Sequence, residues 1–169
     1  MFGNRYEGKK VLITGHTGFK GTWLTSWLLK LGANIVGVSK DIPTSPSMFE
    51  DLNLIQNINS YECDVRDLNN FSKIVAKEKP DVIFHLAAQS LVGLSYENPT
   101  MTWQTNVLGT LNILESLRKL KNTCNAVIIT SDKCYLNKEI HYGYKETDIL
   151  GEFFFLISKV PYINLFFLN

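Results

Sequence analysis

Gly15-His16-Thr17-Gly18-Phe19-Lys20-Gly21 is the stretch that decides the fold, because it directly follows the apolar run Val11-Leu12-Ile13-Thr14. The run predicts a buried strand and the residues after it predict a helix, so three glycines spaced three apart join the two. Gly15 permits a tight exit from the strand, Gly18 omits the Cβ that would block a phosphate, and Gly21 lets the helix lie close on the sheet. The helix start adds free N–H groups and a partial positive charge. The stretch therefore predicts a turn that approaches the pyrophosphate of a dinucleotide.

The composition indicates one globular domain. The chain has 169 residues, of which 45% are hydrophobic, and its formal net charge is +1. This charge gives no electrostatic reason to expect binding to nucleic acid or to an anionic membrane. Cys63, Cys124 and Cys134 show no C-x-x-C spacing, so we expect neither a disulfide framework nor a metal site. Residues 1–10 lack the apolar core of a signal peptide, so we expect a cytoplasmic protein.

Strand and helix signals alternate along the rest of the chain. Residues 19–31 have helical spacing of apolar side chains, and Gly32 is expected to end that helix. Asp67 is the expected N-cap of a second helix, which Pro80 stops. The apolar side chains expected on the face of the first helix are Trp23, Leu24, Trp27, Leu28 and Leu31. Further strands are expected at 35–38, 61–65, 82–86 and 126–130.

A long helix is expected from the Asn98-Pro99 pair to about Lys119. The side chains expected to face inward from it are Trp103, Val107, Leu111, Leu114 and Leu117. Helices of this length between strands require parallel pairing with right-handed crossovers. The sequence thus predicts an α/β fold over residues 1–151: a Rossmann-like doubly wound parallel sheet with helices on both faces. Ligands of such sheets bind at the carboxyl ends of the strands.

Residues 152–169 break this pattern, because they hold half of the ten phenylalanines and have no amphipathic period. One interpretation is a membrane-associating tail, although the segment is shorter than the ~20 apolar residues of a membrane span. A second is a terminal helix or strand that packs on the core. A third, favoured by the low-complexity composition, is out-of-frame translation at the end of a truncated gene. The sheet would then be incomplete at its C-terminal end, and an uncovered strand 126–130 would favour self-association into a homo-oligomer.

Several motifs stand in the order that is typical of one enzyme family. They are the glycine stretch 15–21, Asp64-Val65-Arg66-Asp67, His85-Leu86-Ala87-Ala88-Gln89, Asn106-Val107-x-Gly109-Thr110 and Thr130-Ser131-Asp132-Lys133-Cys134-Tyr135. The chain resembles the extended short-chain dehydrogenases/reductases that act on nucleotide sugars. With Pro43-Thr44-x-Pro46-Ser47-x-Phe49-Glu50 and Leu94-Ser95-Tyr96-Glu97-x-Pro99, residues 5–151 resemble the CDP-glucose 4,6-dehydratases. The resemblance implies an NAD-dependent lyase of deoxysugar biosynthesis that converts CDP-glucose to CDP-4-dehydro-6-deoxyglucose and water.

The resemblance and the strand ends together identify candidate cofactor-binding residues. In the family, an aspartate at the position of Asp64 accepts a hydrogen bond from the adenine amino group, and Val65 lies against the ring. Small residues at 87–88 let a dinucleotide pass close to the backbone, and Asn106 organises the site. His85 lies inside an apolar strand, so we expect a core histidine with satisfied hydrogen bonds. The expected cofactor-binding residues are Gly15, His16, Thr17, Gly18, Phe19, Gly21, Ser39, Asp64, Val65, Ala87, Ala88 and Asn106.

The end of the second strand leaves the choice of dinucleotide open. NAD sites often carry an acidic residue there for the ribose 2′-hydroxyl. Here Ser39 and Lys40 occupy that place, with Asp41 one step further, and a serine and a lysine would tolerate a 2′-phosphate. The resemblance implies NAD, because the family takes a hydride from C4 and returns it to C6 in one cycle. The residues themselves do not exclude NADP.

Ser131, Asp132 and Lys133 are the candidate catalytic residues. Dehydration of a 4-keto sugar needs a hydroxyl to polarise the C4 oxygen, an acid to help the C6 hydroxyl leave and a base for the C5 proton. Ser131 suits the first role, and Asp132 suits the second if burial raises its pKa. Lys133 stands where related dehydratases carry a glutamate, and with a lowered pKa it could be the base. A plain epimerase needs no such pair.

The sequence departs from the family at the redox base. The family has a Tyr-x-x-x-Lys pair after the position of Gly151, whereas Tyr162 here is followed by Phe166 four residues on. Tyr6 and Lys10 have the spacing but precede the first strand. The half of the family fold that binds the nucleotide sugar is also missing. We therefore expect a cofactor-binding half that is inactive alone; a non-catalytic dinucleotide-binding module and a related epimerase or dehydratase remain as alternatives.

Overall fold

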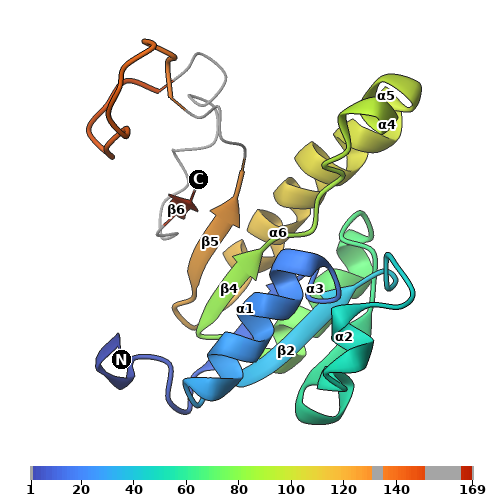
Figure 1. Cartoon of the computed structure of the whole chain (residues 1–169). Helices are drawn as coiled ribbons and strands as arrows, with labels where there is room; N and C mark the ends of the chain where they lie inside the picture. The colour runs from blue at the N-terminus through green and yellow to red at the C-terminus, as the bar shows by residue number, and fades with distance from the viewer. Residues whose placement is uncertain (1, 131–134, 151–164, 169) are drawn as a thin grey trace.

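A parallel β-sheet with the strand order β3-β2-β1-β4-β5-β6 forms the centre of the fold (Figure 1). The computed structural model describes residues 2–130, 135–150 and 165–168. The strands are β1 (Lys10–Thr14), β2 (Asn34–Ser39), β3 (Asn59–Glu62), β4 (Val82–His85), β5 (Asn125–Ile129) and β6 (Leu165–Leu168). All neighbouring strands run parallel, and the order steps away from β1 in both directions. The predicted doubly wound sheet is confirmed, and β1 and β4 flank its switch point.

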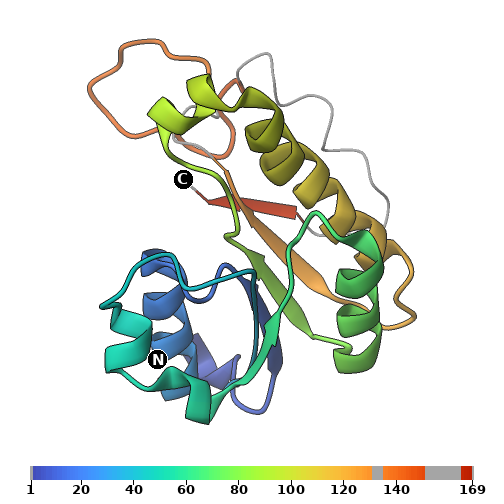
Figure 2. The ribbon, with the colours of Figure 1, turned by 90° about the vertical axis from the view of Figure 1, so that its right-hand side faces the viewer.

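Helices cover both faces of this sheet. They are α1 (Phe19–Lys30), α2 (Met48–Asp51), α3 (Leu68–Glu78), α4 (Val92–Glu97), α5 (Pro99–Trp103) and α6 (Gly109–Arg118), with the 3₁₀ turns η1 (Phe2–Asn4) and η2 (Leu54–Asn57) and the π-helical turn η3 (Gln104–Leu108). Figure 2 shows α1 on one side of the sheet and α3 with α6 on the other. Of the helices within the described residues, none is long and apolar enough to cross a bilayer.

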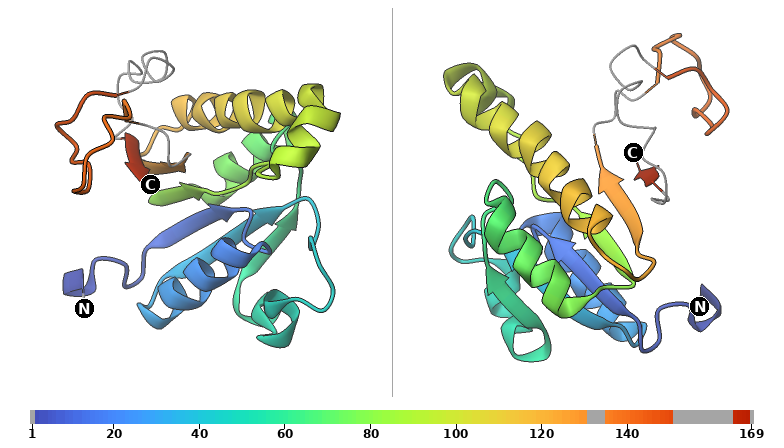
Figure 3. Two further views of the ribbon diagram at one scale, coloured as in Figure 1. Left: turned by 45° about the horizontal axis from the view of Figure 1, so that its top comes forward. Right: turned by 180° about the vertical axis from the view of Figure 1, so that it is seen from behind.

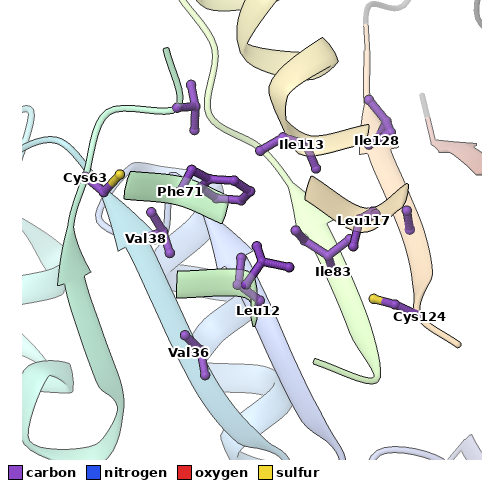
Figure 4. Close-up of a cluster of buried hydrophobic side chains, with 13 residues drawn as sticks. Leu12, Val36, Val38, Cys63, Phe71, Ile83, Ile113, Leu117, Cys124 and Ile128 are labelled. Carbon is purple, nitrogen blue, oxygen red and sulfur yellow. The ribbon is translucent and has the colours of Figure 1, made fainter. Parts of the chain in front are cut away.

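The two faces of the sheet carry separate hydrophobic clusters. On the α3 and α6 side, Phe71, Ile113 and Leu117 pack over Leu12 and Ile83 of the strands (Figure 4). On the α1 side, the cluster consists of Val11, Ile13, Leu28, Ala33, Ile35, Phe84 and Val127. Successive residues of a strand point to opposite faces, so one apolar run supplies both clusters. Burial on both sides explains why the strands are continuously apolar.

Capping residues begin and end three helices where the sequence predicts. Asp67 accepts a hydrogen bond from the Asn70 N–H at 3.1 Å, and Asn98 accepts one from the Met101 N–H at 3.0 Å. Gly32 follows α1 with a φ of +80°, the left-handed conformation that glycine adopts without strain. These signals are local, so they can be read without knowing the fold.

The apolar face expected for α1 is only partly right. Leu28 is buried, and Leu24 and Leu31 are half-buried against the sheet. Trp23 and Trp27 lie on the outer side of the helix, and Trp23 is 58% exposed. A helix on one face of a sheet buries a single stripe, and the two tryptophans lie outside it.

The long helix from Pro99 to Arg118 is formed by α5, η3 and α6 in succession. Of the residues expected to face inward, Leu114 and Leu117 are buried. The other three, Trp103, Val107 and Leu111, are exposed, which corrects the prediction. Figure 3 shows the helix running on past the ends of the strands, so its first part has no sheet beneath it. The π-helical turn also breaks the 3.6-residue period that the prediction assumed.

Strand β3 differs most from its expected bounds of 61–65. It pairs with β2 from Val36↔Asn59 to Ser39↔Glu62, so pairing starts two residues earlier than the apolar pattern suggests. The Cys63 N–H still donates to the Ser39 carbonyl at 3.0 Å. Beyond it the chain leaves the sheet toward α3, because β2 has ended.

Strand β6 consists of four residues of the apolar segment 152–169. It pairs in parallel with β5 from Ala126↔Leu165 to Ile129↔Leu168. The interpretation as a terminal strand thus describes residues 165–168, and these residues cover β5 along that stretch. Residues 151–164 and 169 lie outside the described residues.

Candidate functional site

The glycine turn leaves β1 at the switch point of the sheet, beside the end of β4. Gly15 has a φ of +73°, and its N–H donates to the Val38 carbonyl of β2 at 2.8 Å. The Gly18 N–H donates back to the Gly15 carbonyl at 3.1 Å, and Gly18 then serves as the N-cap of α1. The turn therefore aims the first turn of α1 at the carboxyl edge of the sheet, where ligands of this fold bind.

The three glycines of the turn have different surroundings. A Cβ on Gly15 would lie 2.9 Å from the Ala87 backbone nitrogen, and one on Gly21 would collide with the Gly15 carbonyl oxygen and lie 2.7 Å from the His16 Cα. A Cβ on Gly18 would meet only the Gly15 oxygen, at 3.4 Å. Gly15 and Gly21 thus serve the protein's own packing, whereas the space at Gly18 is open. Gly21 packs against the turn itself rather than against the sheet.

His16 turns its ring into the protein. The side chain is buried, with Nδ1 at 2.9 Å from Ser39 Oγ and Nε2 at 3.0 Å from Ser60 Oγ. Burial lowers the pKa of His16 to about 4, so the ring is neutral near pH 7. The ring thus contacts residues of β2 and β3, and the contact of His16 with a cofactor stays a prediction.

The end of β2 is tied to the turn. The Thr17 hydroxyl donates to the Asp41 carbonyl at 2.7 Å, and the Thr17 N–H lies 3.4 Å from Ser39 Oγ. The Ser39 hydroxyl therefore has hydrogen-bond partners within the protein, and its expected role at the ribose stays a prediction. Lys40 and Asp41 form an exposed ion pair at 3.4 Å, and they are the charged groups at this strand end.

Asp64 follows β3 and is bound by Arg66. Both carboxylate oxygens accept from Arg66 Nε at 3.0 Å, and Oδ2 accepts from Nη2 at 2.6 Å. Arg66 hydrogen bonds lower the pKa of Asp64, so it stays ionised at neutral pH. A hollow of about 450 Å³ lies between this loop and η3, lined by Asp64, Arg66, Asp67, Gln104 and Leu108.

Val65 belongs to the core. It is buried in the cluster under α3 and α6, and a Cβ on Gly109 would lie 2.9 Å from its Cγ2. Its side chain fills the space that Gly109 leaves on α6, and its expected contact with an adenine ring stays a prediction. The two neighbours Asp64 and Val65 thus point to different environments, one to the surface and one to the core.

His85 is a satisfied core histidine, as predicted. Its Nδ1 lies 2.7 Å from Thr14 Oγ1, and its Nε2 lies 3.1 Å from Thr110 Oγ1. Thr14 Oγ1 already accepts from the Leu86 and Ala87 N–H groups, so its own proton goes to Nδ1 and the ring proton sits on Nε2. Burial lowers the pKa of His85 to about 4. The neutral ring joins the ends of β1 and β4 to α6.

Asn106 holds the segment that follows β4. Its Oδ1 accepts from the Gln89 N–H at 2.8 Å, and its Nδ2 donates to the Gln89 carbonyl at 2.9 Å. It lies in η3, and its own carbonyl accepts from the Thr110 hydroxyl at 2.7 Å. Asn106 therefore fixes the main chain at Gln89, in the segment that follows β4, and its expected role as an organiser of the site stays a prediction.

The remaining candidates lie near the glycine turn, after β4 or outside the described residues. Phe19 begins α1 with 75% of its surface exposed, Ala88 is exposed and Ala87 is half-buried beside Gly15. The candidate catalytic residues Ser131, Asp132 and Lys133 lie outside the described residues. In the part of the chain that the structure describes, no group of three or more His, Cys, Asp or Glu could hold a metal ion.

Tyr6 and Lys10 do not form a catalytic pair at this cleft. Lys10 begins β1, at the opposite edge of the sheet from the glycine turn, and its Nζ pairs with Glu78 at 3.0 Å. Tyr6 packs against the cluster on the α1 side. The sequence prediction that these residues lie at the wrong end of the sheet is confirmed.

A family model described as "GDP-mannose 4,6 dehydratase" matches residues 12–150. The chain belongs to this family. CDP-glucose 4,6-dehydratase of Salmonella typhimurium is 47% identical to it over 148 residues, which are 88% of this chain and 41% of that protein. The predicted resemblance to nucleotide-sugar enzymes of this type is therefore confirmed.

Solved structures share the fold. The epimerase Mth375 of Methanothermobacter thermautotrophicus is 32% identical with a TM-score of 0.71, over 86% of this chain and 42% of that one. UDP-glucose 4-epimerase of Thermus thermophilus, a complex with NAD, is 24% identical with a TM-score of 0.68, over 84% and 44% of the two chains. The chain spans about two fifths of the length of these relatives.

The motifs of the family were found from the sequence, but the polar partners that orient them were not. Arg66 stands two residues from Asp64, and that spacing could have predicted their pairing. Ser60 is 44 residues from His16, and Thr110 is 25 residues from His85. No local signal links these pairs, because only the parallel sheet and its helices bring them together.

Proposed function

We propose that this chain binds NAD along the carboxyl ends of β1 to β4, as the cofactor-binding half of an enzyme of the CDP-glucose 4,6-dehydratase type. The observation that carries the proposal is the glycine turn. Added side chains at Gly15 and Gly21 would strike backbone, whereas the space outside Gly18 is open. A turn that packs against the protein at Gly15 and Gly21 and has no side chain at Gly18 leaves room for a pyrophosphate beside its backbone N–H groups.

The start of α1 suits an anion. Gly18 provides no side chain to cap the helix, and the first turn contains no acidic residue. The first N–H groups of a helix lack partners within it and carry a partial positive charge, so a pyrophosphate there would gain hydrogen bonds and favourable electrostatics. Phe19, exposed at the first helical position, would lie beside the bound group.

The adenosine end would lie over β2 and β3. Asp64 is ionised and would accept from the adenine amino group, with Arg66 either sharing the carboxylate or moving aside. At the ribose, the Ser39 hydroxyl is already bonded, so Lys40 and Asp41 are the groups that would meet the 2′ position. Asp41 favours a 2′-hydroxyl and thus NAD, and Lys40 accounts for the tolerance of NADP that the sequence leaves open.

The reaction is proposed from the family and from the motif after β5. NAD supplies the acceptor and donor of the hydride when it is bound. Ser131 would polarise the C4 oxygen of CDP-glucose, Asp132 would protonate the departing C6 hydroxyl, and Lys133 would remove the C5 proton. A related epimerase is the second candidate, since the solved epimerase Mth375 is 32% identical. The carboxylate–amine pair at 132–133 favours the dehydratase.

We further propose that this chain does not turn over CDP-glucose by itself. No Tyr-x-x-x-Lys pair stands in the sequence except Tyr6 and Lys10, and these lie at the opposite edge of the sheet. A general base contributes typically about 10²–10⁴-fold to rate. Formation of the 4-dehydro-6-deoxy product by the purified chain, at about 1 s⁻¹ or faster, would overturn this statement.

Titration of the purified chain with NAD, NADH, NADP and NADPH tests the binding proposal. We expect saturable binding of NAD, and much weaker binding after Gly18→Val, because the valine would fill the phosphate path. Gly143→Val is the matched control, since a Cβ on Gly143 meets no atom within 4 Å and the residue lies in an exposed loop. If the folded chain binds none of the four dinucleotides, the proposal is wrong.

A further inference from the structure

The ring of His16 occupies a notch in the sheet that is lined by unusually small residues. Gly37 on β2 pairs with Ile13 of β1 on one side and with Ser60 of β3 on the other. Ser39 stands two residues beyond Gly37, so Gly37, Ser39 and Ser60 share one face of the sheet. A Cβ on Gly37 would lie 2.6 Å from the His16 Cγ and Nε2. Only glycine leaves room for the ring.

The notch holds the ring by polar and aromatic contacts together. Each ring nitrogen has a serine hydroxyl within 3.0 Å, from Ser39 on β2 and from Ser60 on β3. Phe49 of α2 covers the ring edge-on, with ring centroids 5.2 Å apart and planes at 84°. The His16 carbonyl is also bonded, by the Thr22 hydroxyl of α1 at 3.3 Å. One residue of the turn thus contacts α1, α2, β2 and β3.

These contacts join the two parts of the site that must hold one ligand. The main chain of residues 15–18 forms the turn for the pyrophosphate, while the ends of β2 and β3 carry the residues for the ribose and the adenine. The Thr17 hydroxyl adds a second link between the turn and the end of β2, by donating a hydrogen bond to the Asp41 carbonyl. We propose that His16 is a positioning residue, whose ring in the Gly37–Ser39–Ser60 notch fixes the pyrophosphate turn relative to the adenosine-binding strand ends; this rests on the proposed dinucleotide binding.

The buried ring also accounts for two features of the sheet. Gly37 lies in the middle of β2, where glycine is less favourable than alanine. Its missing Cβ leaves the space that the His16 ring occupies. Ser39 and Ser60 are polar on a face where the neighbouring Ile13 and Ile35 are apolar, and their hydroxyls are the partners that a buried neutral imidazole needs.

A double-mutant cycle of Gly37→Ala and His16→Ala tests the contact. With His16 present, Gly37→Ala forces the ring out of the notch, and we expect a clear fall in the urea midpoint of unfolding. In the chain that carries His16→Ala, the same change meets no ring, and we expect little or no further fall. Independent sites add within experimental error, so non-additivity identifies the contact. Additive losses in the urea midpoint would show that Gly37 does not make room for the His16 ring, and would overturn the proposal.

Ligand binding tests the positioning role and separates it from structural damage. We expect His16→Ala to weaken NAD binding about tenfold, equivalent to about 1.4 kcal/mol, while adenosine, which lacks phosphates, binds within about twofold of the unmodified chain. His16→Asn keeps an amide near Ser39 and should recover most of the NAD affinity. Equal losses for NAD and adenosine would overturn the positioning role.

The two measurements distinguish a failure of this inference from a failure of the proposed function. If the unmodified folded chain binds no NAD, the proposed function and the positioning role are both wrong. The double-mutant cycle still tests whether the His16 ring packs against Gly37. If NAD binds and the His16→Ala chain binds it equally well, only the inference fails. Circular dichroism of each variant verifies that the compared chains are folded.

Discussion

Alanine at Gly21 should damage both the stability of the domain and its ligand site. The added Cβ would collide with the Gly15 carbonyl oxygen and would lie 2.7 Å from the His16 Cα and 2.8 Å from the Gly15 carbonyl carbon. Ordinary contacts between carbon atoms are about 3.5–4.0 Å. All three neighbours are backbone atoms, so a rotamer change of a side chain cannot relieve the clash. The turn or α1 must move by about an ångström.

The magnitude follows from two opposing effects. Overpacking that shifts backbone typically costs about 1–3 kcal/mol, while alanine in place of glycine inside a helix returns about 1 kcal/mol. Because the added Cβ would be too close to three backbone atoms, we expect the upper end of the overpacking range, and thus a free energy of unfolding lower by about 2 kcal/mol in Gly21→Ala. The displaced turn should also weaken NAD binding about tenfold or more, because the N–H groups of the first helical turn no longer point at the pyrophosphate.

Urea unfolding and isothermal titration with NAD, carried out on three variants, check this reasoning. Gly93→Ala is the matched helical control: its Cβ meets nothing within 4 Å, so stability should hold or rise slightly. Gly18→Ala should change the free energy of unfolding by no more than about 1 kcal/mol, because the nearest atom to the added Cβ is the Gly15 oxygen at 3.4 Å. It should still weaken NAD binding, because the methyl group would lie in the proposed path of the pyrophosphate. If Gly21→Ala unfolds and binds like the unmodified chain, the assignment of Gly21 to backbone packing is wrong.

Two further predictions concern the polar groups around the cleft. Asn106→Ala removes both partners of the Gln89 main chain, so we expect a loss of about 1–3 kcal/mol in urea unfolding together with weaker NAD binding; an unchanged midpoint would contradict the role of this bond pair. Stability should also fall with acid. The pKa values of His16 and His85 are lowered to about 4 in the folded chain from 6.5, so the unfolded chain binds protons more readily between those values. The free energy of unfolding keeps its full value above pH 6.5 and falls as the pH drops toward 4, by up to about 3 kcal/mol for each histidine. Unfolding free energies measured from pH 7 to 4 that stay level down to pH 5 would contradict the burial of neutral rings.

Much of this protein was determined by local sequence. The strand–turn–helix at 10–30, the caps at Asp67 and Asn98 and the stop at Gly32 all depend on residues within a few positions of one another. Alternation of strand and helix signals was sufficient to predict the parallel doubly wound sheet, because few other arrangements connect such elements. The apolar surroundings of His85 likewise predicted a core residue. Each of these features is decided by backbone propensity, capping or periodicity, which a single segment contains.

Tertiary structure alone decided where side chains face when their partners are distant in sequence. Val65 enters the core because α6 presents Gly109 above it, although the adjacent Asp64 stays at the surface. Trp103 is exposed because its part of the long helix extends beyond the sheet, where no strand lies beneath its apolar side chains. His16 stands in the turn that we propose for the pyrophosphate, yet its ring is buried because strands β2 and β3 bring Gly37 and Ser60 beneath it. Burial and hydrogen bonding depend on what the packed elements place opposite a residue, and the pattern within one segment contains no information about that.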